Sequence, residues 1–74
     1  MTDRLLDTRG LNCPLPVLKA RKVLMGMAPG TRLEVLATDP KAPGDFRELC
    51  EAAGHRLLEA DEDQGLYRFL IERA

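Results

Sequence analysis

The segment Asn12-Cys13-Pro14-Leu15-Pro16 restricts the fold of this chain more than any other stretch. Each proline fixes φ and lacks an N–H, so the pair does not fit the interior of a sheet and suits the first turn of a helix. Backbone N–H groups in that turn have no intrahelical partner, so their loss costs little. We therefore expect Asn12 or Cys13 at the N-cap and a helix over about residues 14–27.

Cys13 is the residue at which this arrangement has a chemical consequence. The positive end of a helix dipole favours negative charge, and a cysteine placed there tends to have a lowered pKa. The thiolate is the nucleophilic form of the side chain. The alternative is a thiol packed inward as a small hydrophobic group. We interpret Cys13 as a solvent-facing, reactive thiol.

The length and composition of the chain indicate a single domain over residues 1–74. With 45% hydrophobic and 31% charged residues, the chain has the composition of an ordinary soluble globular protein. No apolar run reaches the roughly 20 residues that cross a bilayer. Asp3 and Asp7 interrupt the region where a signal peptide has its apolar block, so we expect a cytoplasmic protein with no membrane partner.

The use of cysteine fits a reduced thiol protein. Cys13 and Cys50 are too few and too far apart to form a secreted disulfide scaffold. No cluster of cysteine and histidine has the spacing of a zinc site, so we expect no metal and no cofactor. A cytosolic thiol is the natural interpretation.

The net charge of −1 conceals an uneven distribution. Residues 1–32 hold six Lys or Arg and two Asp or Glu, whereas residues 33–74 hold five and ten. We expect the basic part to stabilise a Cys13 thiolate and to attract an acidic protein partner. A solvated helix face explains the same charges without a function. The acidic pI of about 5.7 and the 4% aromatic content argue against direct binding of nucleic acid.

Periodic apolar residues predict an alternation of strands and helices. A short strand covers 4–8, and residues 31–38 alternate as a second strand with one buried face. Between them, the proposed helix carries an apolar stripe that Leu18 and Val23 widen. Strand, helix and strand of these lengths predict a βαβ unit with parallel strands, at whose carboxyl ends reactive groups collect. The stripe of the helix consists of Val17, Ala20, Leu24 and Met27.

The second half of the chain predicts one more helix and a hairpin. Asp45 followed by Glu48 resembles a capping box, so we expect the helix to begin there and to end before Gly54. Its buried stripe includes Cys50, which we therefore expect to be packed and inert. Strands over 55–61 and 66–72 follow, joined by a loop at 62–65. The order βαβαββ, with helices on one face, predicts a two-layer α/β sandwich. The full stripe of the second helix is Phe46, Leu49, Cys50 and Ala53.

The region from Leu6 to Pro16 resembles the signature of the TusA/SirA family of small sulfur-carrier proteins, whose core is Cys-Pro-x-Pro. The resemblance covers nearly the whole chain. It continues through Met27-Ala28-Pro29-Gly30, Thr38-Asp39-Pro40, Asp45-Phe46 and Cys50. The Pro-Gly pair within residues 41–44 departs from the family pattern and leaves the start of the second helix open.

The resemblance implies a mixed four-stranded sheet and a function in sulfur transfer. Cys13 would accept sulfane sulfur as a persulfide from a cysteine desulfurase or a rhodanese-like donor, and would pass it to an acceptor protein. Pro14 and Pro16 correspond to the two prolines of the family motif. Relatives act in tRNA 2-thiouridine modification, in molybdenum-cofactor assembly or in sulfur oxidation.

The residues themselves favour a carrier over a self-sufficient enzyme. No general base or oxyanion residue is evident, and the difficult C–S cleavage would belong to the donor. Specificity would then come from protein contacts around the cysteine loop, for which Arg9, Asn12 and Lys19 are the candidates. Two alternatives stay open here. One is a regulatory or protein-interaction module with an incidental thiol, and the other is a redox protein that closes a Cys13–Cys50 disulfide.

Overall fold

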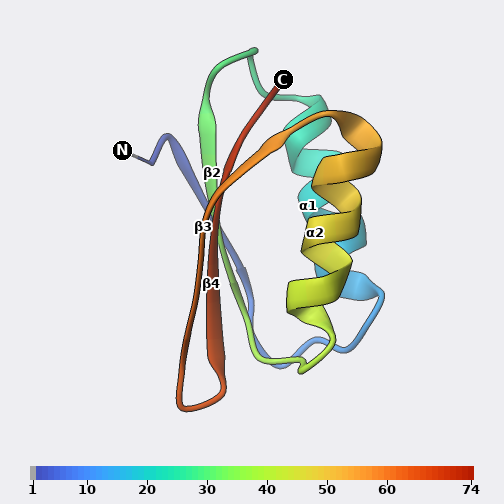
Figure 1. Cartoon of the computed structure of the whole chain (residues 1–74), viewed down its shortest axis with the longest axis vertical. Coiled ribbons are helices and arrows are strands. Elements are labelled where there is room, and N and C mark those ends of the chain that lie inside the picture. The colour runs from blue at the N-terminus through green and yellow to red at the C-terminus, as the bar shows by residue number, and fades with distance from the viewer. Residues whose placement is uncertain (1) are drawn as a thin grey trace.

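Residues 2–74, which the computed structural model describes, form two layers (Figure 1). A four-stranded sheet makes one layer, and both helices cover the same face of it. The predicted order βαβαββ is confirmed. In chain order the elements are β1 (Arg4–Thr8), α1 (Leu15–Met25), β2 (Arg32–Ala37), α2 (Ala42–Ala53), β3 (Arg56–Asp63) and β4 (Leu66–Glu72).

The sheet is mixed, with strand order β1-β2-β4-β3. β1 and β2 are parallel, with Thr8 beside Ala37, whereas β4 runs antiparallel to both β2 and β3. Because β1 and β2 are parallel, the loops that follow them leave the same edge of the sheet. The chain segments before α1 and before α2 therefore meet, although residues 9–14 and 38–41 are far apart in the sequence.

The core lies between the sheet and the helices, where the apolar stripes converge. Phe46 of α2 and Phe69 of β4 are almost completely buried, and their rings stack with centroids 4.6 Å apart. Leu24, Leu33 and most of the other residues expected in the core are buried as well. Two expectations were wrong. Leu18 is 50% exposed on the far side of α1, and Ala53 is exposed at the end of α2.

The starts of both helices differ from the predictions. α1 begins at Leu15 with Pro14 at the N-cap, so neither Asn12 nor Cys13 caps it, and it ends at Met25 with Gly26 as its C-cap. α2 begins at Ala42, before the expected Asp45, and has no side-chain cap. Pro43 fits the first turn, where its missing N–H is not needed, so the helix absorbs the Pro-Gly pair instead of starting after it.

The hairpin between β3 and β4 is tighter than predicted. β3 extends to Asp63, so the turn consists of Gln64 and Gly65 alone. Their φ angles are 50° and 85°. Two positive φ values suit the right-handed twist of the flanking strands, as in a type I′ turn.

The face of the sheet that the helices leave uncovered carries ion pairs between neighbouring strands. Arg68 of β4 contacts Glu34 of β2 at 2.7 Å on one side and Glu59 of β3 at 2.8 Å on the other.

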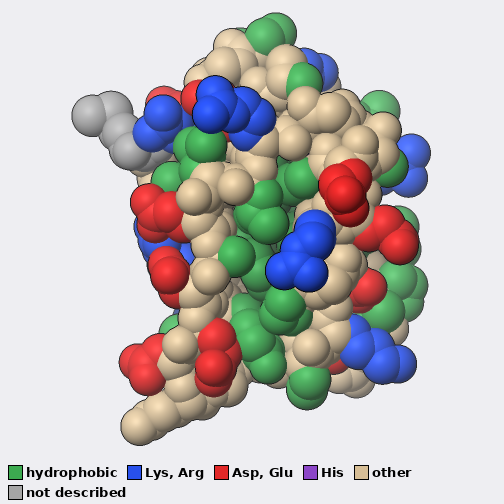
Figure 2. Space-filling model, in the orientation of Figure 1, with side chains coloured by type: hydrophobic (Ala, Val, Ile, Leu, Met, Phe, Trp, Pro, Cys, Tyr) green, Lys and Arg blue, Asp and Glu red, His purple; other side chains and the backbone are tan. Residues whose placement is uncertain are grey.

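On the face shown in Figure 2, basic and acidic side chains are interspersed, and hydrophobic side chains show between the sheet and the helices. Within residues 2–74, no helix has the length and apolar character that a membrane span requires.

Replacing Gly54 with alanine should lower the free energy of unfolding by about 1 kcal/mol, because a side chain disfavours left-handed backbone. Gly54 ends α2 with φ 77°. Gly44 is the matched control, since it lies inside the same helix, and a Cβ there would have no atom within 4 Å. Gly44→Ala should raise the free energy of unfolding by up to about 1 kcal/mol. Urea unfolding measures both variants, and equal effects would contradict the assignment of Gly54 as the helix stop.

Candidate functional site

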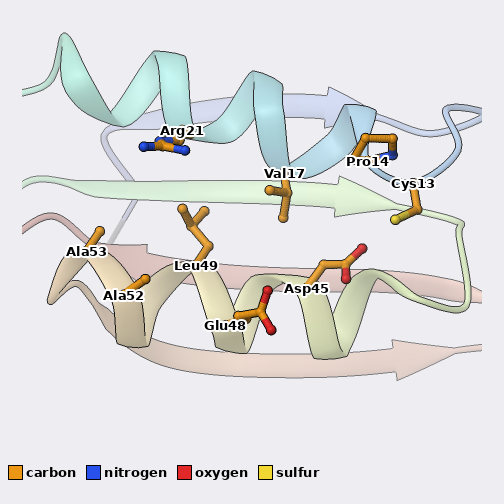
Figure 3. Close-up of a pocket in the computed structure, with 9 residues that line it drawn as sticks. All are labelled: Cys13, Pro14, Val17, Arg21, Asp45, Glu48, Leu49, Ala52 and Ala53. Carbon is orange, nitrogen blue, oxygen red and sulfur yellow. The ribbon is translucent and has the colours of Figure 1, made fainter.

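Cys13 lies at one end of a groove between α1 and α2 (Figure 3). The groove encloses about 350 Å³. The thiol is exposed at its mouth, and Arg21 marks the opposite end of the lining. Residues from both helices and from the loop before α1 line it: Cys13, Pro14, Val17, Arg21, Asp45, Glu48, Leu49, Ala52 and Ala53.

The loop that carries Cys13 is fixed to the loop after β2. The backbone N–H of Cys13 donates a hydrogen bond to a carboxylate oxygen of Asp39, and the N–H of Lys41 donates to the other oxygen at 2.9 Å. The N–H of Gly10 donates to the hydroxyl of Thr38 at 2.9 Å. The hydrogen bonds from the backbone N–H groups of Lys41 and Cys13 lower the pKa of Asp39. The parallel pairing of β1 and β2 makes this junction possible.

The pKa of Cys13 is raised, which contradicts the prediction of an acidified thiol. The largest cause is hydrogen bonding to the Asp45 carboxylate, followed by desolvation and by the negative charges of Asp45 and Asp39. The charge of Lys41 acts in the opposite direction. A carboxylate that accepts the thiol proton favours the neutral form. The helix N-terminus does not determine the pKa of this thiol, because acidic groups from a different part of the chain lie beside it and the basic residues of the first half do not offset them.

Only some of the predicted site residues lie in the groove. Cys13 and Pro14 line it, whereas Pro16 is buried in the first turn of α1. Asn12 is exposed, and its main-chain carbonyl accepts the N–H of Leu15 at 2.9 Å. Its side chain makes no capping hydrogen bond.

The two basic residues predicted for partner contact lie outside the lining of the groove. Arg9 forms a two-pronged ion pair, at 2.9 Å and 2.8 Å, with Asp7 near the end of β1. Hydrogen bonds from Arg9 lower the pKa of Asp7 to about 2. Lys19 is exposed on α1. Both residues are therefore close to Cys13 in the sequence, but neither side chain lines the groove.

Sequence reasoning missed the acidic part of the site. Asp39 and Asp45 reach Cys13, and Glu48 and Arg21 line the groove beyond it. One signal was present, because Asp39 follows the second of two predicted parallel strands and so had to share an edge of the sheet with the cysteine loop. Asp45 was assigned instead to a capping box.

Cys50 differs from Cys13 in its burial. Its side chain is 4% exposed within the core, as predicted, and burial raises its pKa to about 11. Both cysteines are free thiols. Among residues 2–74, no group of three or more His, Cys, Asp or Glu side chains could hold a metal ion.

Fold and site together define a class of small two-layer α/β proteins that present one accessible thiol at a groove between two helices. The family model for Sulfurtransferase TusA matches residues 4–73, and the chain belongs to this family. The resemblance to sulfur-carrier proteins is therefore confirmed.

Individual relatives agree with this membership. The Sulfur carrier protein TusA of Allochromatium vinosum is 44% identical over 72 residues, which cover 97% of this chain and 95% of the relative. Sulfur carrier protein TusA of Pseudomonas aeruginosa is 41% identical over 71 residues, with 96% and 90% covered. A solved SirA-like protein from Desulfitobacterium hafniense superposes with a TM-score of 0.83 at 25% identity, covering 93% of this chain and 95% of that one. These similarities support a sulfur-carrier role.

Proposed function

We propose that Cys13 is the sulfur-bearing residue and carries sulfane sulfur as a persulfide from a donor protein to an acceptor protein. In the loading step, the Cys13 thiolate attacks the outer sulfur of a donor persulfide. A new S–S bond forms on Cys13 while the donor's S–S bond breaks, and the donor leaves as a thiolate, so no external oxidant is consumed. The observation that carries the proposal is that Cys13 is the exposed one of two cysteines and lies at one end of a groove.

The burial of Cys50 supports the same chemistry. A second accessible thiol would attack the persulfide, close a disulfide and release hydrosulfide. Cys50 is both buried and held in its protonated form at neutral pH, since its pKa is about 11. A persulfide on Cys13 would therefore survive until a partner protein removes it.

Mass spectrometry tests the proposal directly. Incubation with a cysteine desulfurase and cysteine should add the mass of one sulfur atom, removable by dithiothreitol. Peptide mapping should locate that sulfur on the peptide containing Cys13. A protein that stays unmodified with both a desulfurase and a rhodanese-like donor would refute the proposal and favour an interaction module with an incidental thiol.

The exchange requires two protein partners, a cysteine desulfurase or rhodanese-like donor and a sulfur acceptor. We assign it to the cytoplasm, where thiols stay reduced. The acceptor would lead to tRNA 2-thiouridine modification, to molybdenum-cofactor assembly or to sulfur oxidation. Contact by Arg9, Asn12 and Lys19 belongs to the same proposal. It is supported by the exposure of Leu15 and Leu18, at 45% and 50%, in the first part of α1, which also carries Lys19.

Reversing the charge of Lys19 should weaken loading by the donor several-fold, because rim charges mainly govern the rate of association. The measurement is the initial rate of persulfide formation on Lys19→Glu as a function of donor concentration. Reaction of Cys13 with iodoacetamide, a small neutral reagent, should not change. A loading rate equal to that of the wild type would remove Lys19 from the contact surface.

A further inference from the structure

The charges around Cys13 have the opposite sign to those that normally activate a thiol. Reactive cysteines usually adjoin a cationic side chain or an unoccupied helix N-terminus. Here the backbone N–H of Cys13 already donates a hydrogen bond to the Asp39 carboxylate. The Asp45 carboxylate is the largest cause of the raised pKa of the Cys13 thiol. The charge of Lys41 lowers the pKa of the thiol and so opposes these carboxylates. Arg21 lies at the other end of the groove (Figure 3).

The carboxylates of Asp39 and Asp45 have different surroundings. Asp39 is committed to the backbone, since it accepts the N–H groups of Cys13 and Lys41 and so holds two loops together. Asp45 stands in the first turn of α2, half-buried, and its carboxylate points across the mouth of the groove toward Cys13 (Figure 3). Among residues 2–74, no basic side chain forms an ion pair with Asp45. The Asp45 carboxylate therefore lies beside the thiol without an ion-pair partner among these residues.

We propose that Asp45, which faces Cys13 across the groove, is a positioning residue that receives a cationic side chain of the sulfur-transfer partner and so places that cation beside the reacting sulfur. The inference rests on the proposed function and names the chemistry that the partner must bring to the groove. A lysine or arginine placed at the mouth would pair with the Asp45 carboxylate and neutralise its charge beside the thiol. The proton then passes to water, and the same cation stabilises the sulfur anion.

This arrangement would make the thiol slow to react until the correct partner docks. A carboxylate beside the sulfur disfavours the thiolate and repels anionic reagents, whereas a cationic group relieves both effects. The basic exposed side of α1 and the acidic mouth of the groove would thus recognise opposite charges on one partner surface. Electrostatic complementarity of this kind selects partners and rejects others.

Small disulfides of different charge test the proposal without any partner protein. Cystamine is cationic, 2-hydroxyethyl disulfide is neutral and dithiodiglycolate is anionic, and each forms a mixed disulfide with an accessible thiol. Wild-type Cys13 should react fastest with cystamine and slowest with dithiodiglycolate. In Asp45→Asn this ratio should fall roughly three- to ten-fold, since one nearby charge is removed. Glu51→Gln is the matched control, because Glu51 is an exposed acidic residue of the same helix outside the lining of the groove, and its ratio should stay at the wild-type value.

The pH dependence of alkylation by iodoacetamide provides a second readout. Asp45→Asn should shift the midpoint of the rate profile to lower pH and make alkylation at neutral pH roughly three- to ten-fold faster. Asp45→Glu should restore the wild-type profile in part. A thermal unfolding curve for each variant separates these effects from loss of structure. If Asp45→Asn does not fold, equal rates of the three disulfides with the wild-type protein would overturn the proposal.

The outcomes separate this inference from the proposed function. An unchanged charge preference and an unchanged alkylation midpoint in folded Asp45→Asn would overturn the role of Asp45. Persulfide loading by a desulfurase could still succeed in that case. Conversely, a protein with the expected charge preference that never accepts sulfur would leave the electrostatics of the groove intact and refute the carrier chemistry.

Discussion

Replacement of Cys13 with serine is expected to abolish sulfur loading. Serine keeps the size and the polarity of the side chain, but its hydroxyl is a far weaker nucleophile than a thiolate. Because Cys13 is exposed in a loop that backbone hydrogen bonds hold in place, the variant should fold normally. Incubation with a desulfurase and radiolabelled cysteine, followed by non-reducing electrophoresis, should show no label on Cys13→Ser.

Cys50→Ala is the matched control for this experiment. Cys50 is 4% exposed and belongs to the core, so the substitution should leave loading unchanged while it destabilises the fold by about 1–2 kcal/mol. Two observations would contradict the assignment. They are substantial labelling of Cys13→Ser, and loss of labelling in a folded Cys50→Ala protein.

Replacement of Phe46 with alanine is expected to cost about 3–5 kcal/mol of unfolding free energy. Phe46 is completely buried and stacks on Phe69 with ring centroids 4.6 Å apart, so the variant loses both the transfer energy of the ring and the aromatic contact. Small domains are stable by only about 5–15 kcal/mol in total. The loss should therefore be visible as a large decrease in the urea midpoint.

Arg47→Ala supplies the comparison for Phe46→Ala. Arg47 is the next residue of α2 and is exposed, so its removal should change the stability by less than about 0.5 kcal/mol. A decrease below about 1 kcal/mol for Phe46→Ala would mean that the core does not depend on this stack. The consequence for the site is direct, since Phe46 adjoins Asp45 in the turn of α2 that faces Cys13.

Most of the fold follows from local patterns. The alternation through Leu33, Val35 and Ala37 predicts β2, and the stripe that includes Phe46 predicts the buried face of α2, because side-chain periodicity reports which face is apolar. The starts of the helices were less predictable. Asp45 followed by Glu48 imitates a capping box, yet Pro43 fits the first turn of a helix that begins earlier.

The sequence by itself determined the order of the elements, the exposed position of Cys13 at the start of a helix and the burial of Cys50. Each depends on short-range signals, which are prolines near a helix start and apolar residues at helical spacing. Only the tertiary structure decided the electrostatics of the thiol. The parallel pairing of β1 and β2 brings Asp39 and Asp45 to Cys13, and charge–charge energies depend on distance in space rather than on separation along the chain.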